Sequence, residues 1–307
     1  MMQAQSRWTD LAGASVHWVD HGGPERPDSL IVCVHGLGGG TVNWDGLAPL
    51  LTDRHRLVAL DLPGSGLTDP GERNADLDAN AELLGAFVDE VAAGSPGARV
   101  VLVGNSMGAV LSAMVLGARP DLADALVLLA PAVPGPGRVP GPMLLGGLGL
   151  YGVPVAGRVV AWGRRRLRTP EQLVGDTLRM CCADPSRVHP ELVARHLELA
   201  RLRMERTELD RPFEQAARSL MVHLADARRA RATYFGLPAG LPVLVVHGTR
   251  DRLVPYAASA RLARAMPGWH FVEALGVGHV PQIETPQWVA DRMREWLATV
   301  LPRARRA

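Results

Sequence analysis

The sequence of 307 residues contains no lysine, so all 33 residues counted as lysine or arginine are arginine. This absence excludes the sites that depend on a lysine side chain, which include the P-loop phosphate site, Schiff-base enzymes, protein kinases and Ser-x-x-Lys acylases. Abundant alanine, with 33 glycines and 24 prolines, makes a GC-rich genome the simplest explanation for arginine in place of lysine. The composition therefore excludes lysine-dependent catalytic and binding sites, but it does not indicate which ligand the protein binds.

Charge of one sign is not in excess, because 33 basic and 31 acidic residues give a formal net charge of +2. This balance does not predict nucleic acid or another polyanion as a partner. Four arginines at residues 164–168 make a local basic run, which we interpret as a solvated face.

Cysteine is scarce, with three residues in the chain. They cannot form a disulfide framework, and Cys181 and Cys182 are adjacent, where a disulfide bond is strained. Cys33 lies in an apolar run and is predicted to be a buried strand thiol. Because the N-terminal sequence also lacks the apolar stretch of a signal peptide, we expect a cytoplasmic protein with reduced thiols.

Long hydrophobic runs are few, and only the uncharged stretch 139–157 needs testing as a transmembrane helix. We reject that interpretation because the stretch contains several glycines and prolines. A membrane span there would also separate the motifs that precede it from those that follow it. We therefore expect no transmembrane segment and interpret 139–157 as an apolar lid over a pocket; transient contact of this lid with a lipid surface is the alternative.

Short apolar runs bounded by glycine, proline or aspartate predict buried parallel strands at 30–34, 57–60, 100–103, 125–129, 243–246 and near 271–274. Helical periodicity follows or separates these runs at 78–92, 107–118, 257–265 and 286–300. For the last of these helices we expect Thr285 as the N-cap and Pro286 at the first position. The alternation predicts a doubly wound α/β sheet.

This alternation stops between about residues 131 and 238, where helical periodicity continues without a convincing strand. We therefore expect one sheet domain interrupted by a helical cap. The predicted organisation is a first core part at 1–132, a cap at 133–237 and a second core part at 238–307.

The strongest motif is Gly104-Asn105-Ser106-Met107-Gly108, which fits the pattern G-x-S-x-G. The pattern alone is weak, but here it lies between a predicted strand and a predicted helix. A sharp turn at that place needs small residues on both flanks and presents the serine hydroxyl at the end of the sheet. Ser106 is therefore the candidate nucleophile.

A serine hydroxyl needs a base within hydrogen-bonding distance, and the base needs an acid that orients it. His279 stands in a glycine-containing loop after the last predicted strand, and Asp251 follows the strand 243–246. Both positions lie at the carboxyl edge of the sheet, in the chain order Ser, Asp, His. His247 ends a strand and is interpreted as structural, and no histidine or cysteine spacing is typical of a metal site, so no metal is expected.

The glycine-rich run 35–40 follows the first buried strand and leaves backbone amides accessible to a developing oxyanion. We assign one donor to the amide of Leu37 and the second to the amide of Met107, at the positive end of the helix after Ser106. A dinucleotide-binding fingerprint is the rival interpretation, and it fails because Thr41 stands where the third glycine belongs.

Through these motifs the chain resembles the α/β-hydrolase superfamily. The motifs occur along the chain in the order typical of that superfamily: His35-Gly36, residues 61–66, residues 104–108, residues 248–251 and Gly278-His279. The resemblance covers about residues 30–131 and 241–307, and leaves the cap uncovered. It implies a mostly parallel, eight-stranded sheet with helices on both faces, an inserted cap, and a Ser106, His279 and Asp251 triad without a cofactor.

The substrate is less well defined by the sequence. Ser106 at the nucleophile position disfavours dehalogenases and epoxide hydrolases, which carry aspartate there, and Val280 stands where meta-cleavage carbon–carbon hydrolases typically have an aromatic residue. We expect a lipophilic carboxylic ester of short or medium acyl length. The alternatives are a meta-cleavage hydrolase, a lactonase, an acyltransferase, a perhydrolase and a non-enzymatic receptor for a small hydrophobic ligand. The candidate substrate-binding residues are Trp44, Gly36, Gly38, Met143, Leu144, Tyr151 and Val280, and Trp44 is equally interpreted as packing beneath the pocket.

Overall fold

The computed structural model describes residues 4–134, 163 and 166–301, and its centre is an eight-stranded sheet in the order β1-β2-β4-β3-β5-β6-β7-β8. The strands are β1 (Gln5–Leu11), β2 (Ala14–Asp20), β3 (Ser29–Val34), β4 (Arg56–Leu60), β5 (Arg99–Asn105), β6 (Ala125–Leu129), β7 (Val243–Gly248) and β8 (His270–Ala274). The pairs β1–β2 and β2–β4 are antiparallel, and every other pair is parallel. The mostly parallel, eight-stranded sheet is therefore confirmed.

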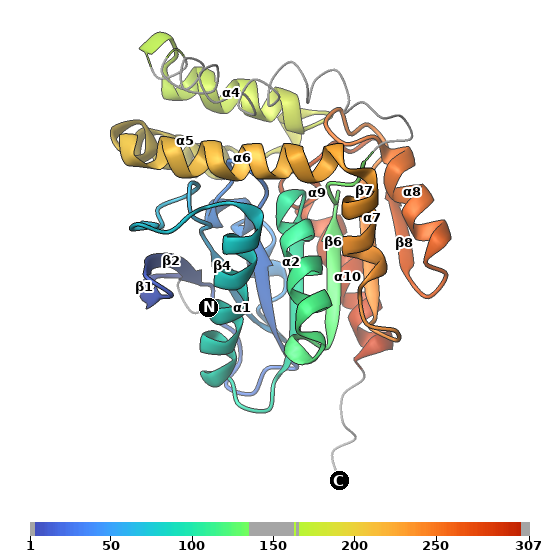
Figure 1. Ribbon diagram of the computed structural model, residues 1–307. Coiled ribbons are helices and arrows are strands. Elements are labelled where there is room, and N and C mark those ends of the chain that lie inside the picture. The colour runs from blue at the N-terminus through green and yellow to red at the C-terminus, as the bar shows by residue number, and fades with distance from the viewer. Residues whose placement is uncertain (1–3, 135–162, 164–165, 302–307) are drawn as a thin grey trace.

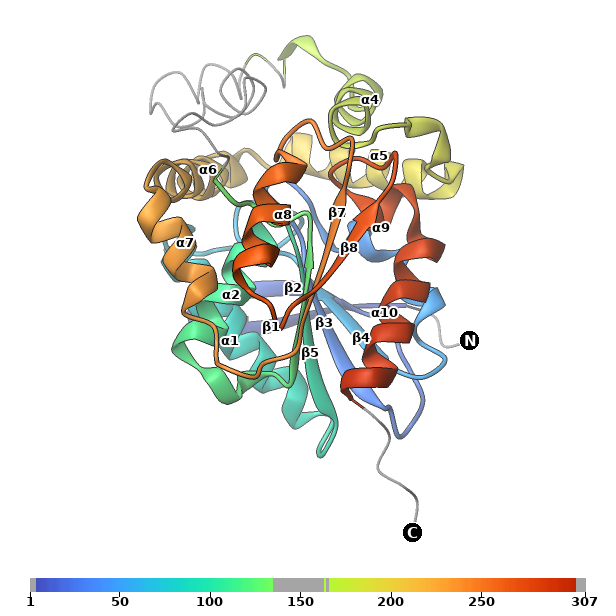
Figure 2. The ribbon, with the colours of Figure 1, turned by 90° about the vertical axis from the view of Figure 1, so that its right-hand side faces the viewer.

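Helices cover both faces of this sheet. They are α1 (Leu77–Ala93), α2 (Met107–Ala118), α4 (Pro170–Cys181), α5 (Pro190–Glu205), α6 (Asp210–Ala225), α7 (Ala227–Phe235), α8 (Tyr256–Ala265), α9 (Pro281–Glu284) and α10 (Pro286–Val300). Figure 2 shows α1, α2, α7 and α8 on one side of the sheet and α9 and α10 on the other.

The alternating side chains of β3 explain why both faces need a cover. Leu30, Val32 and Val34 belong to the core under α1 and α2, whereas Ile31 and Cys33 belong to the core under α10. A strand sends successive side chains to opposite faces, so a strand covered on both sides needs mainly apolar residues at every position. This is why the parallel strands are readable as continuous apolar runs, and why Cys33 is a buried thiol, as predicted.

Two of the predicted helices, α2 and α10, have the predicted bounds. Thr285 is the N-cap of α10 and Pro286 its first residue, as predicted, although the Thr285 side chain makes no cap hydrogen bond. Its hydroxyl donates instead to the carbonyl oxygen of Pro281 at 3.2 Å, one turn earlier in α9. The competing partner inside α9 explains why the threonine does not reach the first amides of α10.

Helices α4, α5 and α6 form a layer across one end of the sheet, above the loops that follow the parallel strands (Figure 1). We call α4, α5 and α6, with the connecting residues 182–189 and 206–209, the helical layer. Helix α7 leaves this layer and runs alongside α2 (Figure 1). The cap boundaries 133 and 237 stay a prediction, and the predicted lid 139–157 lies outside the described residues. Within the described ranges, no helix is both long and apolar enough to cross a membrane.

Candidate active site

Ser106 occupies a tight turn between β5 and α2, with φ of 54° and ψ of −112°. A non-glycine residue rarely has a positive φ, and such strained positions cluster at functional sites. The flanking glycines make the turn possible. A Cβ atom on Gly104 would lie 2.5 Å from the carbonyl oxygen of Gly108, and one on Gly108 would overlap the carbonyl oxygen of Val34. The G-x-S-x-G spacing therefore follows from steric contacts on both sides of the serine.

Asp251 and His279 are joined by a hydrogen bond of 2.7 Å between Oδ2 and Nδ1. Asp251 lies just after β7 and His279 just after β8, and the pairing of these strands brings them together. The second carboxylate oxygen of Asp251, Oδ1, accepts hydrogen bonds from the amides of Leu253 and Val254 at 2.8 and 3.0 Å. The carboxylate is thus fixed from both oxygens, and it holds the ring of His279 by its Nδ1 atom.

A second buried histidine contacts the same carboxylate. Nε2 of His247 lies 3.0 Å from Oδ2 of Asp251 and 3.1 Å from the carbonyl oxygen of Val254. Two acceptors at this nitrogen require that it carries the proton. Burial alone would raise the pKa of Asp251, but the attraction of His279 and the hydrogen bonds from His247 and His279 hold that pKa well below its ordinary value. Asp251 is therefore an anion at neutral pH.

The glycine loop after β3 reaches Ser106 directly, because a Cβ atom on Gly36 would lie 3.0 Å from Cβ of Ser106. His35 holds this loop from inside: its Nε2 accepts the amide of Leu62 at 3.0 Å, and its Nδ1 donates to the carbonyl oxygen of Gly36 at 2.7 Å. Burial lowers the pKa of His35 and favours the neutral ring that this pattern requires. From the helical layer, Arg203 donates to the carbonyl oxygen of Gly38 at 2.9 Å.

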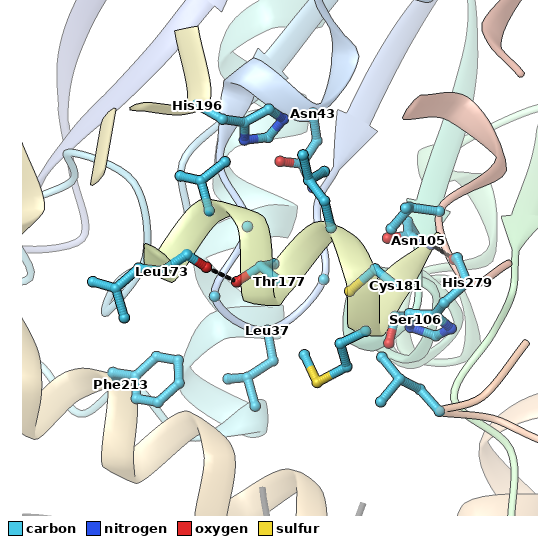
Figure 3. A pocket seen from close by; sticks show the side chains of 18 of the residues that line it. Leu37, Asn43, Asn105, Ser106, Leu173, Thr177, Cys181, His196, Phe213 and His279 are labelled. Carbon is cyan, nitrogen blue, oxygen red and sulfur yellow. Dashed lines mark hydrogen bonds between the residues drawn. The ribbon is translucent and has the colours of Figure 1, made fainter. Parts of the chain in front are cut away.

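A cavity of about 340 Å³ lies between the helical layer and these loops. Ser106, His279, Leu37 and Asn105 line it together with side chains of the helical layer (Figure 3). Most of the lining is apolar, and its larger side chains include Leu173, Val174, Leu178, Leu199, Phe213 and Leu220. A concave, apolar site with a few polar groups at one end is the usual form of a small-molecule site.

The alpha/beta hydrolase family matches this chain over residues 31–292, which includes the serine turn, Asp251 and His279. The chain is an alpha/beta hydrolase. The expected superfamily is therefore confirmed, and it accounts for the topology of the sheet as well as for the order of the motifs.

Other members of known sequence are similar to this alpha/beta hydrolase over most of its length. It is 30% identical over 290 residues to the dihydrolipoyllysine-residue acetyltransferase component of the acetoin cleaving system of Pseudomonas putida, which covers 94% of this chain and 68% of that protein. It is 28% identical over 273 residues to a probable esterase of Oryza sativa subsp. japonica, covering 86% of this chain and 90% of that protein. A putative lipase from Acinetobacter baumannii shares the fold, with a TM-score of 0.74 and 19% identity over 97% of this chain and 92% of that one.

The candidate substrate-binding residues of this alpha/beta hydrolase fall into three groups. Gly36, Gly38 and Val280 line the cavity. Trp44 does not; it is fully buried in the core under α10, so packing beneath the pocket is the interpretation that the structure supports. The remaining three, Met143, Leu144 and Tyr151, lie outside the described residues. Across the described ranges, no cluster of histidine, cysteine and acidic side chains is arranged to hold a metal ion.

Glu284 is a residue of the site's surroundings that sequence reasoning missed. This buried carboxylate of α9 accepts the amides of Gly278 and Ala183 at 2.8 and 2.9 Å, and that of Asp184 at 3.1 Å. It therefore ties the loop before His279 to the connection after α4. A glutamate five residues after a histidine carries no special pattern, so only the fold reveals this function.

The same two segments are in direct contact through their backbones. The amide of His279 donates to the carbonyl oxygen of Cys181 at 2.6 Å, and the side chain of Asn105 donates to the carbonyl oxygen of His279 at 3.1 Å. A Cβ atom on Gly278 would overlap the Cys181 carbonyl group. The loop that carries His279 is thus clamped between β5 and the end of α4.

Replacing Glu284 with glutamine is expected to lower the free energy of unfolding by about 2–4 kcal/mol, because the amide NH₂ would face backbone donors and leave them unpaired. Urea denaturation followed by circular dichroism measures this difference. The matched control is Glu82→Gln, which changes an exposed carboxylate 3.6 Å from Arg73 and is expected to shift stability by less than about 1 kcal/mol. Equal stabilities of the two variants would contradict the function assigned to Glu284.

Proposed function

We propose that this alpha/beta hydrolase is a serine hydrolase that cleaves a lipophilic carboxylic ester of short or medium acyl length through an acyl-enzyme on Ser106. The observation that carries the proposal is the fixed Asp251–His279 pair, whose histidine lines the same apolar cavity as a serine on a strained turn. A nucleophile, a base and an orienting acid are the groups that acyl transfer requires.

In the proposed reaction, Oγ of Ser106 attacks the ester carbonyl carbon while Nε2 of His279 takes the serine proton. Because Nδ1 of His279 is bonded to Asp251, Nε2 is the nitrogen left for this transfer. The tetrahedral intermediate collapses, and His279 protonates the departing alkoxide. His279 then takes a proton from water, which attacks the acyl-enzyme and releases the carboxylic acid and Ser106.

The developing oxyanion is proposed to be bound by the amides of Leu37 and Met107. Leu37 follows Gly36, whose Cα lies against Ser106, and Met107 is the first residue of α2, where the helix dipole favours negative charge. Amides held in place before the reaction starts stabilise the transition state without further reorganisation. Arg203, through its hydrogen bond to the Gly38 carbonyl oxygen, supports the loop that carries the first donor.

The cavity supports the choice of substrate. Its volume of about 340 Å³ and its leucine, valine and phenylalanine lining favour an uncharged acyl or alcohol chain of limited length. We expect hydrolysis of p-nitrophenyl esters to rise and then fall as the acyl chain grows from two to sixteen carbons, with the maximum in the short to medium range. The measurement is kcat/KM for each ester, with the Ser106→Ala protein as the blank.

The alternatives predict different outcomes of the same assay. Faster nitrophenol release on adding an alcohol or hydrogen peroxide, with the matching acyl product, would instead support an acyltransferase or a perhydrolase. Tight ester or lactone binding without Ser106-dependent turnover would support a ligand receptor and would overturn the proposed hydrolysis. A carbon–carbon hydrolase would leave the esters largely intact and cleave a vinylogous 1,5-diketone.

The acid side of the pH profile is expected to show a single ionisation. Asp251 keeps its charge because its pKa is held low, and burial raises the pKa of the Cys181 thiol beside it to about 12. Neither group exchanges a proton between about pH 5 and 8, and the proposed reaction uses one general base, Nε2 of His279. A plot of log(kcat/KM) against pH is therefore expected to rise with a slope of one; a slope of two would contradict the assignment.

A further inference from the structure

The cavity contains a second polar region, at a distance from the nucleophile. His196 of α5 and Asn43, in the short helical turn Thr41–Trp44, both line the cavity. This turn packs against α5, so the two side chains come from contacting elements. Figure 3 shows both on the side of the cavity away from Ser106 and His279.

These two side chains lack protein partners. Nε2 of His196 is buried and has no hydrogen-bond partner among the described residues. The carboxamide of Asn43, a residue 7% exposed, likewise has no such partner in the described part of the chain, and it faces a cavity with apolar walls. A buried polar group without a partner costs about 1–3 kcal/mol, so native structures retain few of them. An unpaired imidazole and carboxamide on one cavity wall indicate that the partner is a ligand.

The chemistry of the pair selects a neutral ligand group. Burial lowers the pKa of His196 to about 4, so its ring is uncharged near neutral pH and offers one donor and one acceptor. Asn43 also offers both. A hydroxyl group, which donates and accepts at one atom, matches such a pair better than a carboxylate, which only accepts.

The arginines of the cavity do not change this conclusion. Arg203 donates to the carbonyl oxygen of Gly38 at 2.9 Å, and Arg206 donates to that of Leu67 at 2.6 Å and to Glu208 at 2.8 Å. Both guanidinium groups are therefore bonded to the loops and turns around the cavity. They hold the helical layer in place. The side chains that form the second polar region, those of His196 and Asn43, are uncharged near neutral pH.

We infer that Asn43 and His196 form a subsite for a hydroxyl group on the lipophilic chain of the substrate, so that the preferred substrate is an ester with a hydroxylated acyl or alcohol chain. This inference rests on the proposed ester hydrolysis and specifies its substrate class. The hydroxyl would satisfy the two unpaired side chains and fix the chain within walls that otherwise select only for size.

Matched substrates test the subsite directly. We expect one length, in a series of p-nitrophenyl ω-hydroxyalkanoates of four to ten carbons, to show kcat/KM about tenfold above the unsubstituted ester, equivalent to about 1.4 kcal/mol. Asn43→Leu and His196→Leu are each expected to abolish this preference, so that the hydroxylated and the unsubstituted ester of the same length have equal kcat/KM. Thr177→Val is the control expected to keep the preference, because the Thr177 hydroxyl already donates to the Leu173 carbonyl oxygen at 2.8 Å.

The outcomes separate the subsite from the proposed function. Turnover of plain esters without a hydroxyl preference at any length, together with equal binding of 1,8-octanediol and 1-octanol, would overturn the subsite and leave ester hydrolysis standing. If no ester is cleaved, calorimetry with the Ser106→Ala protein still decides, since 1,8-octanediol should bind more tightly than 1-octanol, and Asn43→Leu should remove the difference. Equal binding of diol and alcohol would overturn the inference. Thermal melting of each variant confirms that it is folded.

Discussion

The Ser106→Ala protein is expected to lose ester hydrolysis almost completely, with kcat/KM about 10⁵-fold below that of the wild type. In the proposed reaction, the substitution removes the protein atom that forms a bond to the substrate carbonyl carbon. What would remain is binding in the cavity and polarisation by the proposed oxyanion amides, which accelerate water attack only weakly. A p-nitrophenyl ester of optimal chain length and active-site titration of the purified proteins provide the measurement.

The loss should come without unfolding. The backbone of Ser106 makes the contacts that build the turn, since its amide donates to Leu129 at 3.0 Å and its carbonyl oxygen accepts from Ala109 at 3.1 Å. Alanine keeps these bonds and has the same strain at positive φ. A melting temperature near that of the wild type together with absent turnover supports the nucleophile assignment, whereas turnover within about tenfold of the wild type refutes it.

Asp251→Asn is expected to lower kcat by about 10³- to 10⁴-fold, although one side-chain atom changes little in size. Oδ1 still accepts the amides of Leu253 and Val254, so the carboxamide NH₂ is directed toward His279. That NH₂ can only donate, so Nδ1 of His279 must become an acceptor and the ring proton moves to Nε2. Nε2 is then unable to take the serine proton.

A neighbouring variant distinguishes this tautomer effect from general disturbance of the buried cluster. Ser259 lies 2.7 Å from Nδ1 of His247, on the far side of that ring from Asp251, and Ser259→Ala leaves the Asp251–His279 hydrogen bond untouched. We expect this control to keep kcat within about threefold, equivalent to about 0.7 kcal/mol. Comparable losses in both variants would contradict the assigned function of Asp251.

The parts of the fold that the sequence predicts are those with a constrained residue pattern. Strands β3 to β7 are almost entirely buried on both faces, so their positions are readable within two residues or so. The serine turn is equally readable because Gly104 and Gly108 are forced by contacts with backbone atoms. Strand β1 is not found from residue pattern, since most of its residues are exposed and its only sheet neighbour is β2.

The walls of the cavity are beyond sequence reasoning for a different reason. A helical period shows that α4, α5 and α6 each have an apolar face, but it does not show which loop that face covers. Trp44 and Asn43 illustrate the problem, because adjacent residues of one short turn point into the core and into the cavity respectively. Glu284 acquires its meaning from partners such as Ala183 and Asp184, about a hundred residues away in sequence. For His196 the informative feature is a ring nitrogen, Nε2, that has no hydrogen-bond partner in the described part of the chain.

The clamp between the end of α4 and the loop of His279 has a consequence for recombining members of this family. Exchanging helical layers between relatives is an attractive way to change specificity, but a crossover placed between Cys181 and Asp184 would separate the acceptors and donors that Glu284 and His279 require. The helical layer of another family member would follow a different backbone path at that junction. Chimeras that inherit residues 181–187 together with 276–284 from one parent keep both segments of this contact. We expect these combinations to keep His279 in position while the rest of the cavity lining is exchanged.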